Sequence, residues 1–248
     1  MKKKLAIIGA GIAGLTLANF VKKNSDHDFM LYEKEESLSL DEGYGIQLAT
    51  NSIKILNKIN FNKINNEKIF HPDTLDFYNI KNEKICDLNL SKFNNSETKY
   101  TTLQRSTLIE FLKEDIYTQH LRFGKKIKEV SELKDKILLK FDDNTNDLVD
   151  YVIAADGIFS NTRSFFEKEK NEPKFKRALA VRAILKSKPE LNINEKNADT
   201  SRLPAREPRN YQISGKLVKF RKNRELGEVM PVYPKSACRC MLSKESHP

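Results

Sequence analysis

A glycine-containing turn near the amino terminus constrains the possible folds more than any other feature. The stretch LAIIGAGIAGLTLANF (5–20) joins an apolar run at 4–9 to a helix-like apolar pattern at 12–23. This pattern predicts a strand buried on both faces, a tight turn and a helix. A second apolar run at 29–33 completes a β-turn-α-turn-β unit. We therefore expect an α/β fold with a parallel sheet.

The glycine spacing has a specific chemical use. In a G-x-G-x-x-G turn, Gly9 permits the tight bend, Gly11 lets backbone N–H groups approach a pyrophosphate, and Gly14 lets helix and strand pack closely. Glu33 closes the second strand 19 residues after Gly14. A carboxylate there accepts hydrogen bonds from ribose hydroxyls and repels a 2′-phosphate. The turn predicts a dinucleotide with an unphosphorylated adenosine ribose, and it leaves NAD and FAD open.

Other periodic segments predict the elements that follow this unit. Helices are expected from Asn51, acting as an N-cap, and from Arg105. Strands are expected at 74–80, 84–90 and 136–143, and a buried strand at 150–157 stops at Asp156-Gly157.

Three later segments bear on the choice between NAD and FAD. They are EGYGIQLATNSIKIL (42–56), LQRSTLIEFL (103–112) and DYVIAADGIFSNTR (150–163). In this order, and together with the glycine turn, they resemble motifs of the single-component FAD-dependent aromatic hydroxylases. That family contains the salicylate, p-hydroxybenzoate and ubiquinone-pathway hydroxylases. The resemblance covers roughly residues 4–185. It implies a Rossmann-type FAD-binding domain, a parallel sheet with helices, plus a mostly antiparallel β substrate domain that is incomplete here.

The resemblance also implies roles for individual residues. Arg105 corresponds to an arginine that contacts the flavin cofactor, and Asp156 belongs to a second fingerprint linked to NAD(P)H use. Arg163 closes that fingerprint or forms a structural ion pair, and both interpretations stay open. The implied cofactor-binding residues are Gly9, Gly11, Gly14, Glu33, Gly45, Arg105, Asp156 and Gly157.

The reaction implied by the resemblance is carried by the cofactor. NAD(P)H reduces FAD, O2 adds to form a flavin hydroperoxide, and a small aromatic or quinone-precursor substrate is hydroxylated. We therefore assign no catalytic residue and find no credible Ser-His-Asp arrangement. Two alternatives remain: a truncated, inactive FAD-binding relative, or another FAD oxidoreductase of the reductase or amine oxidase type. A dehydrogenase that uses nicotinamide alone would leave Arg105 and the Asp156 segment without a role.

The sequence departs from the family pattern in several places. Thr50 replaces a proline and Gln104 replaces a histidine, and a third fingerprint of the G-D-A-A-H type is missing. YQISGKLVKF (211–220) resembles a strand of the substrate-domain sheet. We expect an FAD-binding domain at 1–172, with 70–100 contributing to the substrate sheet, and a partial substrate domain at 173–248. From about residue 198 the chain becomes rich in Arg and Pro, which leaves open a flexible tail, an altered reading frame or a truncated end.

Composition and charge limit the classes of binding partner that we expect. The formal net charge is +10, but the lysines are scattered among Asn and Ile, and no Lys/Arg stripe is interleaved with aromatics. This pattern argues against a nucleic-acid partner. The apolar run at the amino terminus is too short for a membrane span, so we expect a cytoplasmic protein without an integral membrane segment. Cys86, Cys238 and Cys240 suggest neither a disulfide framework nor a metal site. The oligomeric state stays open.

Overall fold

The computed structural model describes residues 2–38, 40, 45–78 and 83–167, together with strand residues 179–180, 216–222, 225–226 and 230–233. The chain divides into two compact units. The first contains 1–42, 56–64 and 105–174, and the second contains 43–55, 65–104 and 175–248. The boundary expected after residue 172 lies outside the described residues. No described helix is long and apolar enough to cross a membrane.

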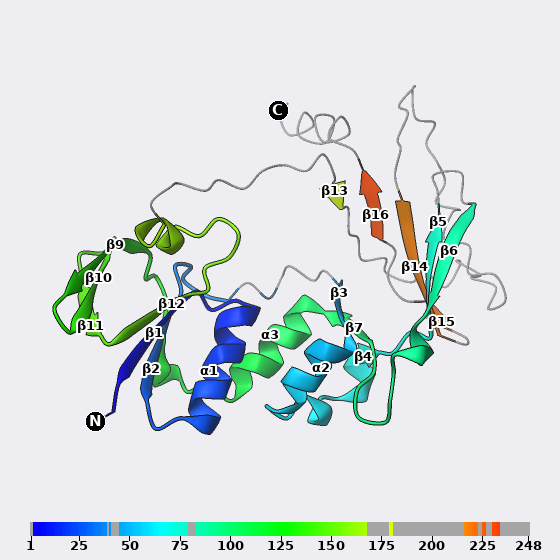
Figure 1. Cartoon of the computed structure of the whole chain (residues 1–248), viewed down its shortest axis with the longest axis horizontal. Helices are drawn as coiled ribbons and strands as arrows, with labels where there is room; N and C mark the ends of the chain where they lie inside the picture. Colours follow the sequence, from blue (N-terminus) through cyan, green and yellow to red (C-terminus); the bar gives the residue numbers. More distant parts are fainter. Residues whose placement is uncertain are drawn as a thin grey trace, which may run out of the picture. The chain divides into compact units, whose positions relative to one another are not determined.

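The first unit is built on a four-stranded parallel sheet, which confirms the expected α/β class (Figure 1). The strand order is β12 (Tyr151–Ala154), β1 (Lys4–Ile8), β2 (Asp28–Tyr32) and β8 (Leu121–Arg122). The chain leaves the central strand β1 and enters helix α1 (Ile12–Asn24) through the glycine turn. Each segment of the predicted β-α-β unit thus forms within a residue or two of its expected position.

Helix α1 covers one face of this sheet, and α3 (Arg105–Glu114) packs against α1. Ile7 points from β1 toward α1, and Leu15, Leu108 and Leu112 are buried in the helix layer. Asn19, also buried, donates from Nδ2 to the Leu112 carbonyl at 2.7 Å and so joins the two helices. This bond satisfies a polar group whose unpaired burial would be costly.

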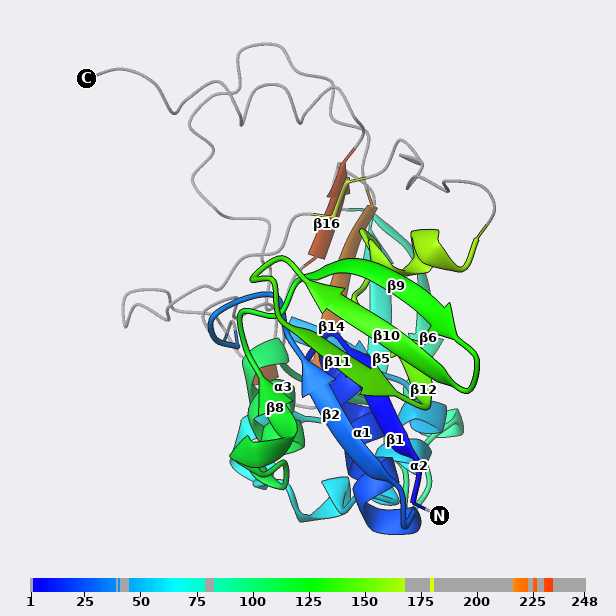
Figure 2. The same cartoon turned by 90° about the vertical axis from the view of Figure 1, so that its left-hand side faces the viewer.

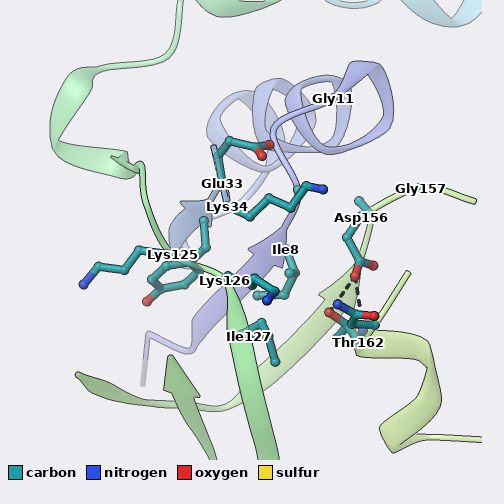
Figure 3. A pocket seen from close by; sticks show the side chains of 14 residues that line it. Ile8, Gly11, Glu33, Lys34, Lys125, Lys126, Ile127, Asp156, Gly157 and Thr162 are labelled. Atoms are coloured by element: carbon teal, nitrogen blue, oxygen red, sulfur yellow. Dashed lines mark hydrogen bonds between the residues drawn. The ribbon is translucent and has the colours of Figure 1, made fainter. Parts of the chain in front are cut away.

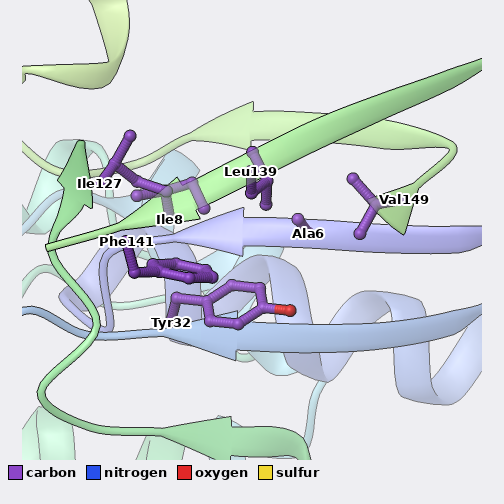
Figure 4. Close-up of a cluster of buried hydrophobic side chains, with 7 residues drawn as sticks. All are labelled: Ala6, Ile8, Tyr32, Ile127, Leu139, Phe141 and Val149. Atoms are coloured by element: carbon purple, nitrogen blue, oxygen red, sulfur yellow. The ribbon is translucent and has the colours of Figure 1, made fainter. Parts of the chain in front are cut away.

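A three-stranded antiparallel sheet covers the opposite face (Figure 2). Its strands are β9 (Ile127–Leu133), β10 (Lys136–Phe141) and β11 (Asn146–Val149). Since side chains alternate along a strand, the even-numbered residues of β1 and β2 face this layer. Figure 4 shows the resulting core, in which the Tyr32 ring lies beside Phe141 at 4.9 Å between centroids. The core residues are Ala6, Ile8, Tyr32, Ile127, Leu139, Phe141 and Val149.

The second unit contains two antiparallel sheets. One has the order β3 (Gly45–Leu48), β7 (Thr101–Gln104) and β4 (Ile69–Phe70). The other has the order β13 (Leu179–Ala180), β16 (Met230–Tyr233), β14 (Lys216–Lys222), β5 (Thr74–Tyr78) and β6 (Lys84–Asn89), with β15 (Glu225–Leu226) paired to β14. The segment 211–220 thus supplies part of β14, which pairs with β5 in the expected antiparallel β sheet.

The remaining helices are short. Helix α2 runs from Thr50 to Asn57, and the described part of the chain also contains five 3-10 turns between other elements. These turns are η1 (Phe61–Lys63), η2 (Asn66–Lys68), η3 (Leu90–Lys92), η4 (Thr118–His120) and η5 (Thr162–Phe165).

Two local predictions are wrong. Asn51 is not the N-cap of α2, because the helix already includes Thr50 and the Ile53 N–H bonds to the Ala49 carbonyl. The strand that ends before Asp156 is not buried, since Tyr151 is 53% and Ile153 38% exposed. Among the described strands, β12 pairs only with β1 and forms the edge of the parallel sheet. Apolar composition therefore did not reveal which strand lies at the edge.

Candidate functional site

A pocket of about 220 Å³ opens at the carboxyl ends of the parallel strands (Figure 3). Its walls come from the ends of β1, β2 and β12, the start of α1, the segment 125–127 and the loop 155–162. Ligands of open parallel sheets bind at this end of the strands. Five predicted site residues line the pocket: Gly9, Gly11, Glu33, Asp156 and Gly157.

Gly9 occupies a position that only glycine fits. Its φ of +102° lies in a region that side chains rarely adopt, and a Cβ would lie 2.5 Å from the Ala155 carbonyl oxygen. Its N–H donates to the Tyr32 carbonyl at 2.7 Å, which fixes the turn to the end of β2. The glycine turn therefore passes directly over the backbone that leads into Asp156.

Gly14 and Gly11 differ in what surrounds them. A Cβ on Gly14 would lie 1.9 Å from the Gly9 carbonyl oxygen, so this glycine allows the helix to pack on the turn. A Cβ on Gly11 would meet no atom of the described residues within 4 Å and would project into open space. Gly11 is also the N-cap of α1, and no side chain caps the helix there. The amino end of a helix carries a partial positive charge, so this opening suits a phosphate.

Glu33 stands directly after β2 and is half-buried. Its Oε2 accepts a hydrogen bond from the Ala10 N–H at 2.7 Å, and its Oε1 accepts one from the Glu35 N–H at 3.1 Å. The carboxylate is thus held against the glycine turn at the rim of the pocket. A carboxylate oxygen has two acceptor sites, so these bonds leave capacity for ribose hydroxyls.

Asp156 organises the loop that follows β12. Its carboxylate accepts hydrogen bonds from the Ser160 hydroxyl, from the Thr162 N–H at 3.1 Å and from the Thr162 hydroxyl at 2.9 Å. Burial tends to raise the pKa of Asp156, but these hydrogen bonds outweigh it, and the pKa is lowered. The side chain therefore stays ionised and holds η5 against the strand end. Gly157, at a φ of +83°, makes the bend between them.

Three lysines at the pocket were not predicted from the sequence: Lys34, Lys125 and Lys126. The Lys125 ammonium donates to Asp143 and to the Thr145 hydroxyl, and Lys126 pairs with Asp142 at 3.0 Å. Backbone bonds from the ends of β2 to the segment after β8 bring these residues to the rim. The position of Lys125 and Lys126 depends on strand pairing across about ninety residues, and the scattered lysines of the sequence gave no signal of it.

Gly45 and Arg105 lie outside the set of pocket-lining residues. Gly45 begins β3 and stands opposite Gln104, the last residue of β7. Helix α3 begins at the next residue, Arg105. The β3–β7 register thus explains how two motifs separated by about sixty residues come together in the fold.

Arg163 lies in η5, where its Nε is 3.4 Å from Oε2 of Glu167, and both side chains are partly exposed. The described residues contain no cluster of three or more His, Cys, Asp or Glu side chains suited to a metal ion.

The sequence of the chain is similar to sequences of known proteins. The NAD(P)-binding Rossmann-like domain family matches residues 7–41, the segment that contains the glycine turn and Glu33. Over 163 residues the chain is 27% identical to 6-hydroxynicotinate 3-monooxygenase of Pseudomonas fluorescens, covering 64% of this chain and 42% of that protein. It is 30% identical over 175 residues to 6-methylsalicylate 1-monooxygenase of Aspergillus terreus, covering 64% and 38%. The chain spans about two fifths of the length of these curated relatives.

Solved structures share the fold. A salicylate hydroxylase substrate complex matches with a TM-score of 0.69 at 18% identity, covering 100% of this chain and 58% of that one. Klebsiella pneumoniae HpxO, solved with FAD and uric acid, matches with a TM-score of 0.69 at 18% identity, covering 93% and 56%. Over about two thirds of its length the chain is thus similar in sequence to FAD-dependent aromatic monooxygenases, and it shares the fold of the solved hydroxylases.

Proposed function

We propose that this chain binds FAD in the pocket at the carboxyl ends of β1, β2 and β12. The observation that carries the proposal is the open space beside Gly11, at the uncapped amino end of α1. A pyrophosphate fits there because N–H groups and the helix dipole both favour negative charge. Glu33 stands at the rim, where it would accept hydrogen bonds from the adenosine ribose.

The other predicted residues have distinct roles in this proposal. Gly9 and Gly14 bring the turn, helix and strand close together. Asp156 and Gly157 shape the loop opposite the turn, and Arg105 supplies a guanidinium suited to a phosphate or to the polar edge of the flavin. Gly45, buried at the start of β3 in the second unit, is proposed to contribute its backbone to cofactor binding. The unit that holds the parallel sheet is then the FAD-binding part of the protein.

We further propose that the protein is a monooxygenase that uses NAD(P)H and O2 to hydroxylate a small aromatic compound. Bound FAD would supply the redox chemistry. The residues of this chain would hold and orient the cofactor and keep water from it. The names of the relatives, which act on hydroxynicotinate and methylsalicylate, support a substrate with an aromatic ring that is already hydroxylated. The reaction would consume NAD(P)H. We also propose that the chain works in the cytoplasm.

Steady-state turnover of the purified chain, reconstituted with FAD, tests the proposed reaction. NADH or NADPH oxidation and oxygen uptake are measured together, with and without a panel of hydroxylated benzoates and pyridines. The expected result is oxidation stimulated by one of these compounds, with a hydroxylated product detected by mass spectrometry. The Gly11→Ala variant serves as the control, because the added methyl projects into the pocket. If the chain binds FAD but no compound of the panel stimulates NAD(P)H oxidation, the proposed hydroxylation is contradicted and only the proposal of FAD binding stands.

A further inference from the structure

Three polar side chains form a connected group between the parallel and antiparallel sheets, and one of them, Tyr32, belongs to a residue that lines the pocket. The Tyr32 hydroxyl donates to Oδ2 of Asp147, and the Lys4 ammonium donates to Oδ1 of the same carboxylate at 2.6 Å. Lys4 lies on β1, Tyr32 on β2 and Asp147 on β11. The group, named here the Tyr32–Asp147–Lys4 triad, therefore joins three strands from two sheets.

The triad is unusual in its surroundings. The Tyr32 ring is 3% exposed and packs among Ile8, Phe141 and other apolar core residues (Figure 4). A phenylalanine would fill the same apolar space, so packing alone does not require the hydroxyl. The Asp147 and Lys4 side chains are 27% and 33% exposed, which lets their charges reach solvent at the edge of the layer.

The pKa values of Asp147 and Tyr32 are shifted in opposite directions. Burial tends to raise the pKa of Asp147, but hydrogen bonds from Lys4 and Tyr32 outweigh it, and the pKa is lowered. The pKa of Tyr32 is raised, first by burial and then by its bond to Asp147. The phenol therefore remains a neutral donor to an ionised carboxylate, which is a stronger bond than one between neutral groups.

Tyr32 is also the residue that holds the glycine turn. Its carbonyl accepts the Gly9 N–H at 2.7 Å, and the next residue, Glu33, accepts the Ala10 N–H at 2.7 Å. Both bonds depend on where the end of β2 lies. The side chain that anchors this end is bonded to Asp147, a residue 115 positions away in the sequence.

We propose that the Tyr32–Asp147–Lys4 triad positions the end of β2, and through it the glycine turn, for binding of the dinucleotide phosphates. Tyr32, Asp147 and Lys4 are positioning residues, which act through the Tyr32 carbonyl and Glu33. The identity of the ligand as FAD rests on the proposed function. The effect of the triad on the turn does not rest on the proposed function, because it can be measured in the protein without ligand.

The test uses the full chain with Tyr32→Phe, Asp147→Asn and the control Tyr151→Phe. Tyr151 belongs to the same sheet and is half-exposed, so its variant makes the same chemical change away from the turn. Amide hydrogen exchange is followed by NMR at Gly9 and Ala10 and, for reference, at Ala6 and Ile7 of β1. In Tyr32→Phe, exchange at Gly9 and Ala10 should rise about tenfold more than exchange at the β1 amides. The reason is that the lost hydrogen bond favours local opening of the turn more than it favours global unfolding.

Asp147→Asn keeps Tyr32 and an acceptor oxygen but loses the charge. It should therefore show a smaller rise of about threefold, since hydrogen bonds to charged groups are roughly twice as strong. FAD titration of the same proteins should give a Kd about tenfold higher for Tyr32→Phe, or about 1.4 kcal/mol of binding free energy. Tyr151→Phe should match the unmodified chain in exchange and in Kd.

The outcomes separate this inference from the proposed function. If the unmodified chain binds no FAD, the proposed function fails, and exchange at Gly9 and Ala10 alone decides the inference. Equal changes at the turn and at the β1 amides would mean that the triad only stabilises the fold, and would overturn the inference. So would selective exchange at the turn combined with an unchanged Kd in a chain that binds FAD.

Discussion

At the scale of single residues, the three glycines of the turn have separate tasks. Gly9 and Gly14 are required by close contacts within the protein, whereas a Cβ at Gly11 would project into open space. Glycine spacing is visible in the sequence, but the difference between a packing glycine and a pocket glycine depends on the atoms nearby. The two classes are expected to respond differently to a single added methyl group.

Gly14→Ala should destabilise the protein by about 3 kcal/mol, because the new Cβ meets the Gly9 carbonyl oxygen and the backbone must shift. Gly11→Ala should cost less than about 1 kcal/mol, the range of a weak N-cap change. Urea unfolding followed by circular dichroism gives both values. Equal destabilisation by the two substitutions would contradict the assigned packing.

Thr162 is fully buried and gives Asp156 two of its hydrogen bonds. Thr162→Val keeps the shape and removes the hydroxyl donor, so it should cost about 1–2 kcal/mol of stability. It should also move the pKa of Asp156 upward, since a bond that favours the ionised form is lost. Carboxyl carbon shifts followed by NMR between pH 2 and 6 measure the change. An unaltered titration of Asp156 would show that the Thr162 hydroxyl is not its partner in solution.

At the scale of elements, the ends of strands are fixed by carboxylates that bond to backbone N–H groups. Asp150, directly before β12, accepts the Lys4 N–H at 2.7 Å, and Lys4 accepts the Asp150 N–H at 2.8 Å through its carbonyl. The Lys136 ammonium approaches Asp150 at 2.9 Å from β10. One side chain thus sets the register of β1 and β12 and contacts the antiparallel sheet. Glu33 has the same kind of role at the glycine turn.

Because of Asp150, the stability of the β1–β12 pairing should depend on pH. The hydrogen bond from the Lys4 N–H, and to a smaller extent the bond from the Lys136 ammonium, lowers the pKa of Asp150 to about 2. An aspartate in an unfolded chain has a pKa of about 3.9. The contribution of Asp150 is therefore complete above about pH 4 and is lost as the pH falls toward 2. The stability difference between the unmodified chain and Asp150→Asn should shrink over that interval, as measured by urea unfolding at a series of pH values. A difference that is constant from pH 6 to pH 2 would refute this role.

At the scale of the whole molecule, the parts predicted from the sequence are those set by local patterns. The β-α-β unit, the glycine turn and the position of Glu33 follow from apolar periodicity and spacing within about thirty residues. The β12 edge, the three pocket lysines and the Tyr32–Asp147–Lys4 triad depend on which distant strands become neighbours. Periodicity carries no information on that pairing. The partners of Glu33 were also hidden, because its bond to Ala10 depends on the path of the turn.

The central claim is that the pocket beside the glycine turn binds FAD, and a binding titration tests it most directly. FAD is added to the purified full chain and to Gly11→Ala while flavin fluorescence and the visible spectrum are recorded, with ADP as competitor. The account predicts saturable binding that ADP reverses and that Gly11→Ala weakens about tenfold or more, since the methyl would enter the space proposed for the phosphates. Absence of binding to the folded chain, or equal binding by Gly11→Ala, would contradict it.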